Sequence, residues 1–221
     1  MLDRLAMVFI LLGVCTSLMI VKDILRRPHP VRIMNLVWPI TGLYMPFFGW
    51  LAWWFFARKS RQKSWLTPAS RRQSPEIRQI FSSTSHCAAG CALGDIVAIP
   101  IVSILNYSPF HSLLLSHAIF SLALSFVFGV LLQFFALRQL EGFSIFRALW
   151  QAIKTDFFSL VVYQVGMFLY MELAFCFILH GQIEPRVLRF WFMLQIALFT
   201  GFIFAWPANK FLLQRGIKTV V

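Results

Sequence analysis

The sequence predicts an all-α protein that crosses a membrane as a bundle of about six helices. The chain has 221 residues, of which 59% are hydrophobic and 13% are charged. A soluble domain has about 45–50% apolar and about 25% charged residues, so this composition belongs to the membrane class. Apolar runs of about 20 residues, the length needed to cross a bilayer, follow one another along the chain. Short polar stretches, which hold most of the basic residues, separate these runs.

Six apolar runs are candidate spans. The first covers residues 5–21, and we interpret it as a membrane helix because no small-residue cleavage site of a signal peptide follows it. The others cover residues 34–56, 80–105, 113–137, 157–179 and 190–213. We therefore expect residues 1–221 to form a single transmembrane domain.

Two of the intervening segments have a recognisable character. Residues 58–78 combine Arg and Lys with Ser and Pro, as expected of an exposed cytoplasmic linker. Residues 143–156 place apolar side chains on one helical face and Arg147 and Lys154 elsewhere, which predicts an amphipathic helix lying along the membrane interface.

Basic residues predict the orientation of the bundle. With six spans, one side of the membrane receives fourteen Lys and Arg residues and the other receives six. Cytoplasmic loops carry the excess of Lys and Arg, so we expect a multi-pass protein of the cell membrane with both termini in the cytoplasm. The first outer loop is nevertheless basic, because it contains Lys22, Arg26, Arg27 and Arg32.

Several functional classes are disfavoured by the sequence. The net charge of +12 does not indicate nucleic-acid binding, because the basic residues lie between spans and form no single exposed face. Phosphate loops, His-Glu-x-x-His zinc motifs and serine nucleophile elbows are not found, which favours a protein without a catalytic site. The four cysteines lie in or beside apolar segments, unlike the disulfide framework of a small secreted domain.

The most reactive residues of the chain gather in HCAAGCALGD, residues 86–95, within the third span. At about 100° per residue, one half of a helix would carry all of its polar and glycine positions. These are His86, Cys87, Gly90, Cys91, Gly94 and Asp95. Gly90 and Gly94 form a Gly-x-x-x-Gly pair, which lets a neighbouring helix approach closely.

This segment predicts a soft-metal site. Thiolate ligands suit Cu(I) and Zn(II), and thioethers suit Cu(I). Cys87 and Cys91 are the candidate primary ligands, and His86 is a secondary one. Met167 and Met171 share one face of the fifth span and are the candidate ligands from a partner helix. Packing explains the same residues without a metal, because Cys, Gly and Ala make a tight helix seam and Met fills gaps in bundles.

Ionisable residues within the spans are candidates for an ion or proton pathway. Asp95 in the third span and Glu172 in the fifth are the two carboxylates concerned. We expect Glu172 to face the bundle interior, or else to lie near enough to the outer surface to stay hydrated. His117 and His180 are possible accessory ligands, although a lone membrane histidine more often makes an interhelical hydrogen bond.

Several segments together resemble one family of bacterial and archaeal integral membrane proteins, whose shared domain has no known function and carries a His-Cys-x-x-Gly-Cys-x-Leu-Gly-Asp signature. They are HCAAGCALGD, VWPITGLY (37–44), AIKTDFFSL (152–160), VGMFLYM (165–171) and WPANKFLLQRGIK (206–218). The resemblance runs from about Asp23 to Lys218 and implies a multi-pass protein of the bacterial inner membrane, with no assigned activity. It places the signature on His86, Cys87, Gly90, Cys91, Leu93, Gly94 and Asp95. Further matching positions are Asp156, Gly166, Met167, Met171, Pro207, Asn209, Gly216 and Lys218. Glu172 stands where the family leads us to expect a histidine.

Three functions remain open from the sequence. The first is binding or transport of a soft transition-metal ion, with Cu(I) favoured and zinc the other candidate. The second is a structural or interaction subunit, whose Gly/Cys/Ala face packs against another membrane protein or a second copy of the chain. The third is a redox protein working through thiols, or through a haem held by His86 and His117.

Overall fold

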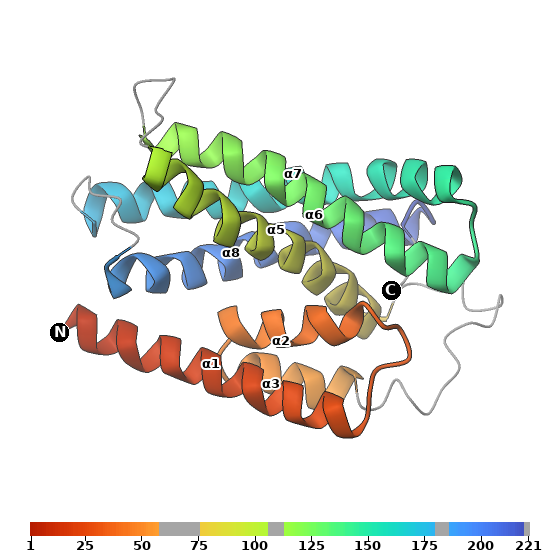
Figure 1. The fold of residues 1–221 in the computed structure, drawn as a ribbon, viewed down its shortest axis with the longest axis horizontal. Helices are drawn as coiled ribbons and strands as arrows, with labels where there is room; N and C mark the ends of the chain where they lie inside the picture. The colour runs from red at the N-terminus through yellow and green to blue at the C-terminus, as the bar shows by residue number, and fades with distance from the viewer. Residues whose placement is uncertain (58–75, 106–112, 180–185, 219–221) are drawn as a thin grey trace.

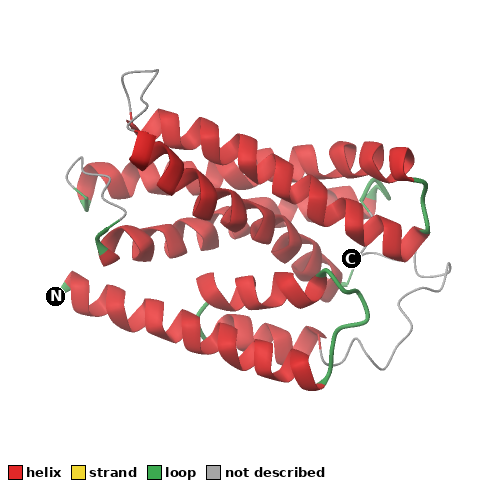
Figure 2. Ribbon diagram, viewed as in Figure 1, coloured by secondary structure: helices red, strands yellow, loops and turns green. Residues whose placement is uncertain are grey.

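The computed structural model describes residues 1–57, 76–105, 113–179 and 186–218. Helix is the only regular secondary structure in those residues (Figure 2), which confirms the all-α prediction. In chain order the helices are α1 (Leu2–Arg26), α2 (Met34–Tyr44), α3 (Phe48–Ala52), the π-helical turn η1 (Trp53–Ala57), α5 (Ile77–Leu105), α6 (Leu113–Glu141), α7 (Ile145–Phe177) and α8 (Leu188–Gln214).

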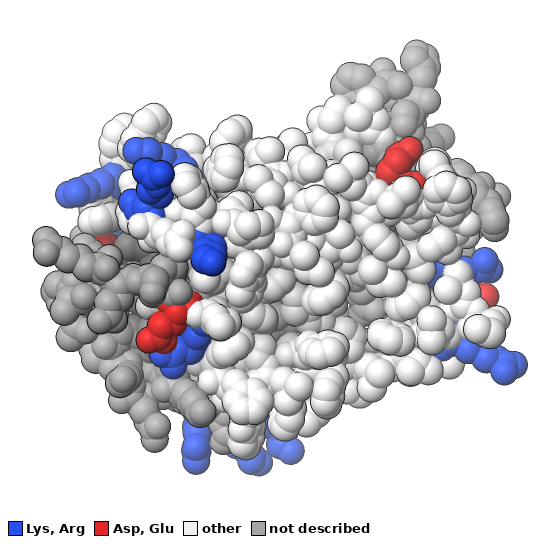
Figure 3. All heavy atoms as spheres, turned by 180° about the vertical axis from the view of Figure 1, so that it is seen from behind, with Lys and Arg blue, Asp and Glu red and all other residues white. Residues whose placement is uncertain are grey.

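Five of these helices, α1, α5, α6, α7 and α8, are long and apolar enough to cross a membrane. The 25 residues of α1 span about 38 Å, against about 30 Å for the hydrocarbon core of a bilayer. Charged side chains gather at the two ends of the molecule and leave a broad uncharged band between them (Figure 3). The chain is therefore a multi-pass membrane protein, and its environment is the lipid bilayer.

The segment predicted as the second span is a hairpin of short helices. With 11 residues, α2 is about 16 Å long and reaches only halfway through a bilayer core. The helix ends at Tyr44, and Pro46 has no N–H with which to continue it. Phe47 takes a positive φ of 64°, and the chain then runs back along α2 as α3 and η1 (Figure 1). Residues 34–57 thus enter the bundle and leave it at the same end.

Neighbouring helices hold the tip of this hairpin. A Cβ added to Gly49 would lie 2.8 Å from the Cα of Gly42, so the two arms touch through glycine. The Phe47 N–H donates to Thr16 Oγ1 of α1 at 3.2 Å, and Gln195 Nε2 of α8 donates to the Leu43 carbonyl at 2.8 Å. Irregular backbone at membrane depth is tolerated where protein buries it and satisfies its polar groups, as it does here.

Because the hairpin does not cross, the described residues supply five candidate crossings, and α1 begins at the end of the bundle opposite to that where α8 ends (Figure 1). Asp3 Oδ1 lies 2.5 Å from Arg189 Nε, so the N-terminus is beside the start of α8. At the other end, Gln139 Nε2 donates to the Pro30 carbonyl at 2.8 Å, which places the end of α6 beside the loop after α1. The expectation of both termini on one side depended on a sixth crossing, and this arrangement does not provide one.

The amphipathic segment predicted at 143–156 is continuous with the fifth span. Helix α7 has 33 residues and is about 50 Å long, so its first turns extend beyond a bilayer core instead of forming a separate interfacial helix. Ile145, Phe146 and Trp150 are exposed there. Of the predicted linker 58–78, residues 58–75 lie outside the described residues.

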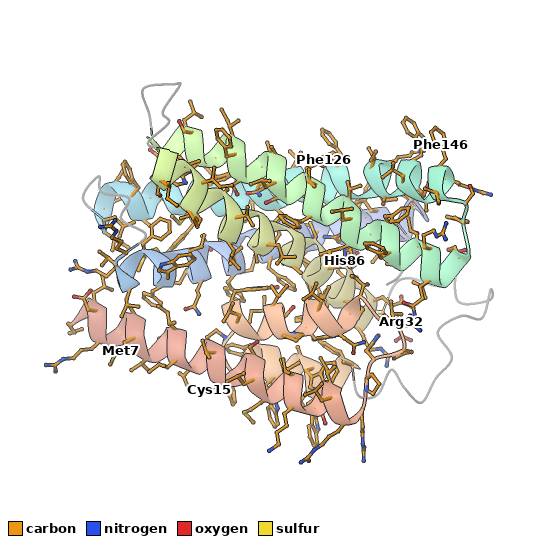
Figure 4. The ribbon with its side chains drawn as sticks, in the orientation of Figure 1. Met7, Cys15, Arg32, His86, Phe126 and Phe146 are labelled. Atoms are coloured by element: carbon orange, nitrogen blue, oxygen red, sulfur yellow. The ribbon has the colours of Figure 1, made fainter. Side chains whose placement is uncertain are left out.

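Helix α5 occupies the centre of the bundle and is the most deeply buried of the five long helices. It packs against α6, α7, α8 and α2. The segment from Ser83 to Ala92 is almost entirely inaccessible to solvent or lipid. The fold therefore places the polar part of α5 in the interior, while the outer face of α1, with Met7 and Cys15, points away from the bundle (Figure 4).

Candidate functional site

The two cysteines of α5 lie side by side in the bundle core. Cys87 and Cys91 are both free thiols with no exposed surface. They are one helical turn apart, and their thiols are close enough to interact. The Ser159 hydroxyl of α7 also adjoins the Cys87 thiol.

The methionines predicted as partner ligands come to the same region. Met167 and Met171 of α7 are 1% and 5% exposed and belong to the same buried cluster as Cys87 and Cys91. The tip of the hairpin joins this cluster through Tyr44 and Met45. This cluster therefore contains the four sulfur-bearing side chains predicted from the sequence, and it adds two that sequence reasoning missed. We use the name sulfur cluster for Cys87, Cys91, Met167, Met171, Met45 and Met193.

The glycines of α5 pack against another helix of the same chain. A Cβ on Gly90 would lie 2.7 Å from the Cα of Gly129 on α6. A Cβ on Gly94 would overlap Ser125 of α6. The predicted close approach at Gly90 and Gly94 is therefore real, and its partner is α6 of the same chain. This face is not free to dock another membrane protein.

Asp95 lies in a set of polar contacts next to the sulfur cluster. The Ser121 hydroxyl of α6 donates to Asp95 Oδ1, and Asp95 Oδ2 has no hydrogen-bond partner. One turn away, Ser125 donates to the Cys91 carbonyl at 3.3 Å and accepts from Gln164 Nε2 of α7 at 2.8 Å. Polar groups from three helices thus line one side of the thiols.

His86 is buried beside charged residues that also lie near Cys87. Its ring lies near Asp156 and Lys218 and beside the Leu132 carbonyl of α6. The same two charged residues lie near the Cys87 thiol. His86 is inside the bundle (Figure 4), and neither ring nitrogen has a hydrogen-bond partner among the described residues.

A buried ion pair beside His86 was not among the predicted site residues. Lys218 Nζ lies 3.0 Å from Asp156 Oδ1, and both side chains are fully buried. The same ammonium donates to Asn209 Oδ1 at 3.0 Å and to Ser159 Oγ at 3.3 Å. Asn209 Oδ1 also accepts from Ser83 Oγ of α5 at 3.2 Å. We call these five residues the lysine cluster.

The turn after α8 makes this cluster possible. Gly216 takes a positive φ of 65°, which favours glycine, and Ile217 and Lys218 then bond back to the Leu212 carbonyl. The signal in the sequence was the resemblance itself, which singled out Asp156, Asn209 and Lys218 at separate places along the chain. Nothing in their spacing indicates that the three side chains meet.

Other predicted residues lie apart from both clusters. Glu172 is exposed on α7 and accepts a weak hydrogen bond from Cys176 at 3.7 Å, so it faces outward and not into the interior. His180 lies outside the described residues. His117 is buried near the start of α6, fifteen residues and about 22 Å along the helix from Leu132, where His86 lies. Those two histidines are too far apart to hold one haem iron between them.

Among the residues that the structure describes, no group of three or more His, Cys, Asp or Glu side chains is arranged to hold a metal ion. A site assembled by the usual zinc ligands is therefore not present in that part of the chain. The sulfur cluster differs from such a zinc site, because two of its donors are thiols and the others are thioethers.

Comparison with known families supports the resemblance in the sequence. Residues 77–218 match the model of a family described as a domain of unknown function, DUF4396. The chain belongs to this family. The DUF4396 match begins at the start of α5 and ends at Lys218, so it contains the two buried cysteines, both methionines of α7 and the whole lysine cluster. The hairpin and VWPITGLY (37–44) lie before it. No curated protein and no solved structure matches the chain.

Proposed function

We propose that the protein binds Cu(I) in the membrane through Cys87 and Cys91, with Met167 as a further ligand and Met171 beside it. The observation that carries this proposal is the burial of two adjacent free thiols in one cluster with these thioethers. Soft sulfur ligands select Cu(I), which is stable with a small number of such donors. Zinc would require a fuller tetrahedral set of ligands, so copper is the better fit.

An ion pair lies beside the proposed copper ligands. Two thiolates and one Cu(I) form a complex with a single negative charge. Lys218 and Asp156 both lie near Cys87, and because their charges cancel they place no net charge beside this complex, in a region where unpaired charge is costly. His86 lies near the same ion pair.

The hairpin supports a role in moving the ion as well as holding it. Its tip contributes Tyr44 and Met45 to the cluster that contains the thiols. Membrane proteins tolerate broken helices at this depth where they are buried in protein or line a water-filled cavity. We propose that copper reaches or leaves Cys87 and Cys91 past Met45.

The copper proposal predicts a stoichiometric metal that depends on two of the four cysteines. Protein purified in detergent under reducing conditions and loaded with Cu(I) is expected to hold roughly one copper per chain by elemental mass spectrometry. The Cys87→Ser, Cys91→Ser variant is expected to lose it, since a hydroxyl is a poor ligand for Cu(I).

The chain offers a matched control for this experiment. Cys15 and Cys176 are both exposed, and the Cys15→Ser, Cys176→Ser variant should retain the copper. Full retention of copper by the Cys87→Ser, Cys91→Ser variant would reject the site. Absence of copper from the loaded wild-type chain would reject the function.

We also propose that the protein lies in the cell membrane with the C-terminal end of α8 in the cytoplasm and the N-terminus outside. Described basic residues at the N-terminal end of the bundle are Arg4, Arg186 and Arg189. The opposite end has many more, namely Lys22, Arg26, Arg27, Arg32, Arg78, Arg138, Arg147, Lys154, Lys210 and Arg215. Excess Lys and Arg marks the cytoplasmic side. The basic loop after α1, which the six-span topology placed outside, lies on the cytoplasmic side in this proposal.

Reporter fusions test this topology. Green fluorescent protein fused after Val221 should fluoresce, and alkaline phosphatase fused there should be inactive, because the first folds in the cytoplasm and the second needs an oxidising compartment. Active alkaline phosphatase at the C-terminus would reverse the proposed orientation.

A further inference from the structure

The Lys218 ammonium sits in a cage of oxygen atoms that come from two helices. Its three contacts are Asp156 Oδ1 at 3.0 Å, Asn209 Oδ1 at 3.0 Å and Ser159 Oγ at 3.3 Å. The ammonium donates hydrogen bonds to Asn209 and Ser159, and the Asp156 carboxylate lies at ion-pair distance. The Lys218 and Asp156 side chains are both 0% exposed.

Two of the three oxygens of the cage belong to side chains that have contacts besides Lys218. The Ser159 hydroxyl of α7 donates to the backbone carbonyl of Asp156, one turn earlier, at 3.3 Å. Asn209 is fixed on α8, where its Nδ2 donates to the Ala205 carbonyl at 3.0 Å. Ser83 of α5 donates to Asn209 Oδ1 at 3.2 Å. Withdrawal of the ammonium would leave three buried oxygens, of which the amide and the hydroxyl keep these contacts.

Lys218 is attached to the rest of the chain by comparatively few contacts. It follows the glycine turn at Gly216, and its backbone N–H bonds to the Leu212 carbonyl at 3.3 Å. Gln151 Nε2 donates to the neighbouring Ile217 carbonyl at 3.2 Å. The cage belongs to long helices, whereas its occupant belongs to the short segment after α8.

The cage also has unused acceptor capacity. Asp156 Oδ2 has no hydrogen-bond partner, and it would lie 3.8 Å from a Cβ on Gly129 of α6. Both nitrogens of the nearby His86 ring are unpartnered as well. An isolated Lys–Asp pair would not need these extra polar groups, and buried polar atoms without partners are costly in a membrane.

We propose that Asp156, Ser159 and Asn209 form a binding site for a monovalent metal cation, and that Lys218 is a tethered ammonium occupying the same place. Oxygen donors from a carboxylate, an amide and a hydroxyl suit a hard cation and not a soft one. The single carboxylate selects a charge of +1, because a divalent ion would leave an uncompensated positive charge in the bundle. This site adjoins the sulfur cluster through Ser159, which lies beside Cys87, but its donors are oxygens and its test does not involve copper.

The test uses Na⁺ as the probe and full-length protein in detergent. Lys218→Met removes the ammonium and keeps an apolar stem of similar length. The Tm of this variant is expected to rise by about 3–6 °C when choline chloride is replaced by NaCl at equal ionic strength, at a Na⁺ concentration about tenfold above Kd. The wild-type Tm should not change, because Lys218 already fills the cage.

The Asp156→Asn, Lys218→Met double variant is the matched control, and its Tm should be the same in both salts, since the carboxylate that binds Na⁺ is absent. Lys218→Gln is a second variant for use if Lys218→Met folds poorly, because it keeps a hydrogen-bond donor in the cage. Its Tm should likewise be higher in NaCl than in choline chloride. Equal Tm values in NaCl and choline chloride for both single variants would overturn the proposal. So would a double variant that responds to Na⁺ as strongly as Lys218→Met.

Discussion

Replacing Asp156 with asparagine is expected to lower the free energy of unfolding by about 3–5 kcal/mol. Asparagine has nearly the same shape, so the substitution removes charge and little else. It leaves the Lys218 ammonium fully buried, with Asn209 and Ser159 as its contacts and no negative partner. The desolvation cost of that ammonium is then no longer offset by the carboxylate 3.0 Å away.

Denaturant or thermal unfolding in detergent and sodium-free buffer measures this loss. Asp3→Asn is the control, because Asp3 pairs with Arg189 at the surface, with side chains 57% and 43% exposed. An exposed pair contributes about 0–1 kcal/mol, so Asp3→Asn should have little effect. The Asp156→Asn, Lys218→Met double variant should be destabilised by clearly less than the sum of its single changes. A loss at Asp156 no larger than that at Asp3 would contradict the buried ion pair.

Replacing Gly90 with valine is expected to destabilise the isolated protein by about 1–3 kcal/mol or more. The first added carbon would lie 2.7 Å from Gly129 Cα and 2.9 Å from its backbone nitrogen. No side-chain rotation relieves contact with a backbone, so α5 and α6 would have to move apart. That separation would also disturb Ser121 and Ser125, which bond to Asp95 and to the Cys91 carbonyl.

Ala123→Val on α6 is the matched control for Gly90→Val. Ala123 is exposed on the outer face of the bundle, so added methyl groups there meet lipid or detergent. Its effect should be within about 0.5 kcal/mol. If Gly90→Val left unfolding unchanged and instead released a second protein from the purified complex, the glycine seam would be an intermolecular surface after all.

The hairpin is the clearest difference between the sequence prediction and the fold. A hydropathy profile reports the composition of residues 34–56 but not the direction in which the chain runs. An apolar hairpin and an apolar span therefore give the same profile. Pro46 and the glycines at 42 and 49 were the available signals. Only packing shows that Gly42 and Gly49 touch and that Thr16 and Gln195 satisfy the tip.

The candidate site was also predicted only in part from the sequence. Periodicity placed Cys87, Cys91, Gly90, Gly94 and Asp95 on one half of a helix, and the structure shows that half inside the bundle. Periodicity also put His86 on that half, but helical angle alone does not say which neighbour a side chain meets. His86 turns toward Asp156 and Lys218, and Glu172 points out of the bundle.

The sequence by itself determined the class of protein and its long apolar helices, because these follow from composition and from the length of the apolar runs. Only the tertiary structure decided that residues 34–57 turn back, that the sulfur-bearing residues of α5 and α7 share a cluster, and that Lys218 reaches Asp156. Asp156 and Lys218 are 62 positions apart, and their contact depends on how α7 and α8 pack and on the turn at Gly216. Local sequence patterns encode the geometry of one element, whereas an ion pair between elements is set by the packing of the whole bundle.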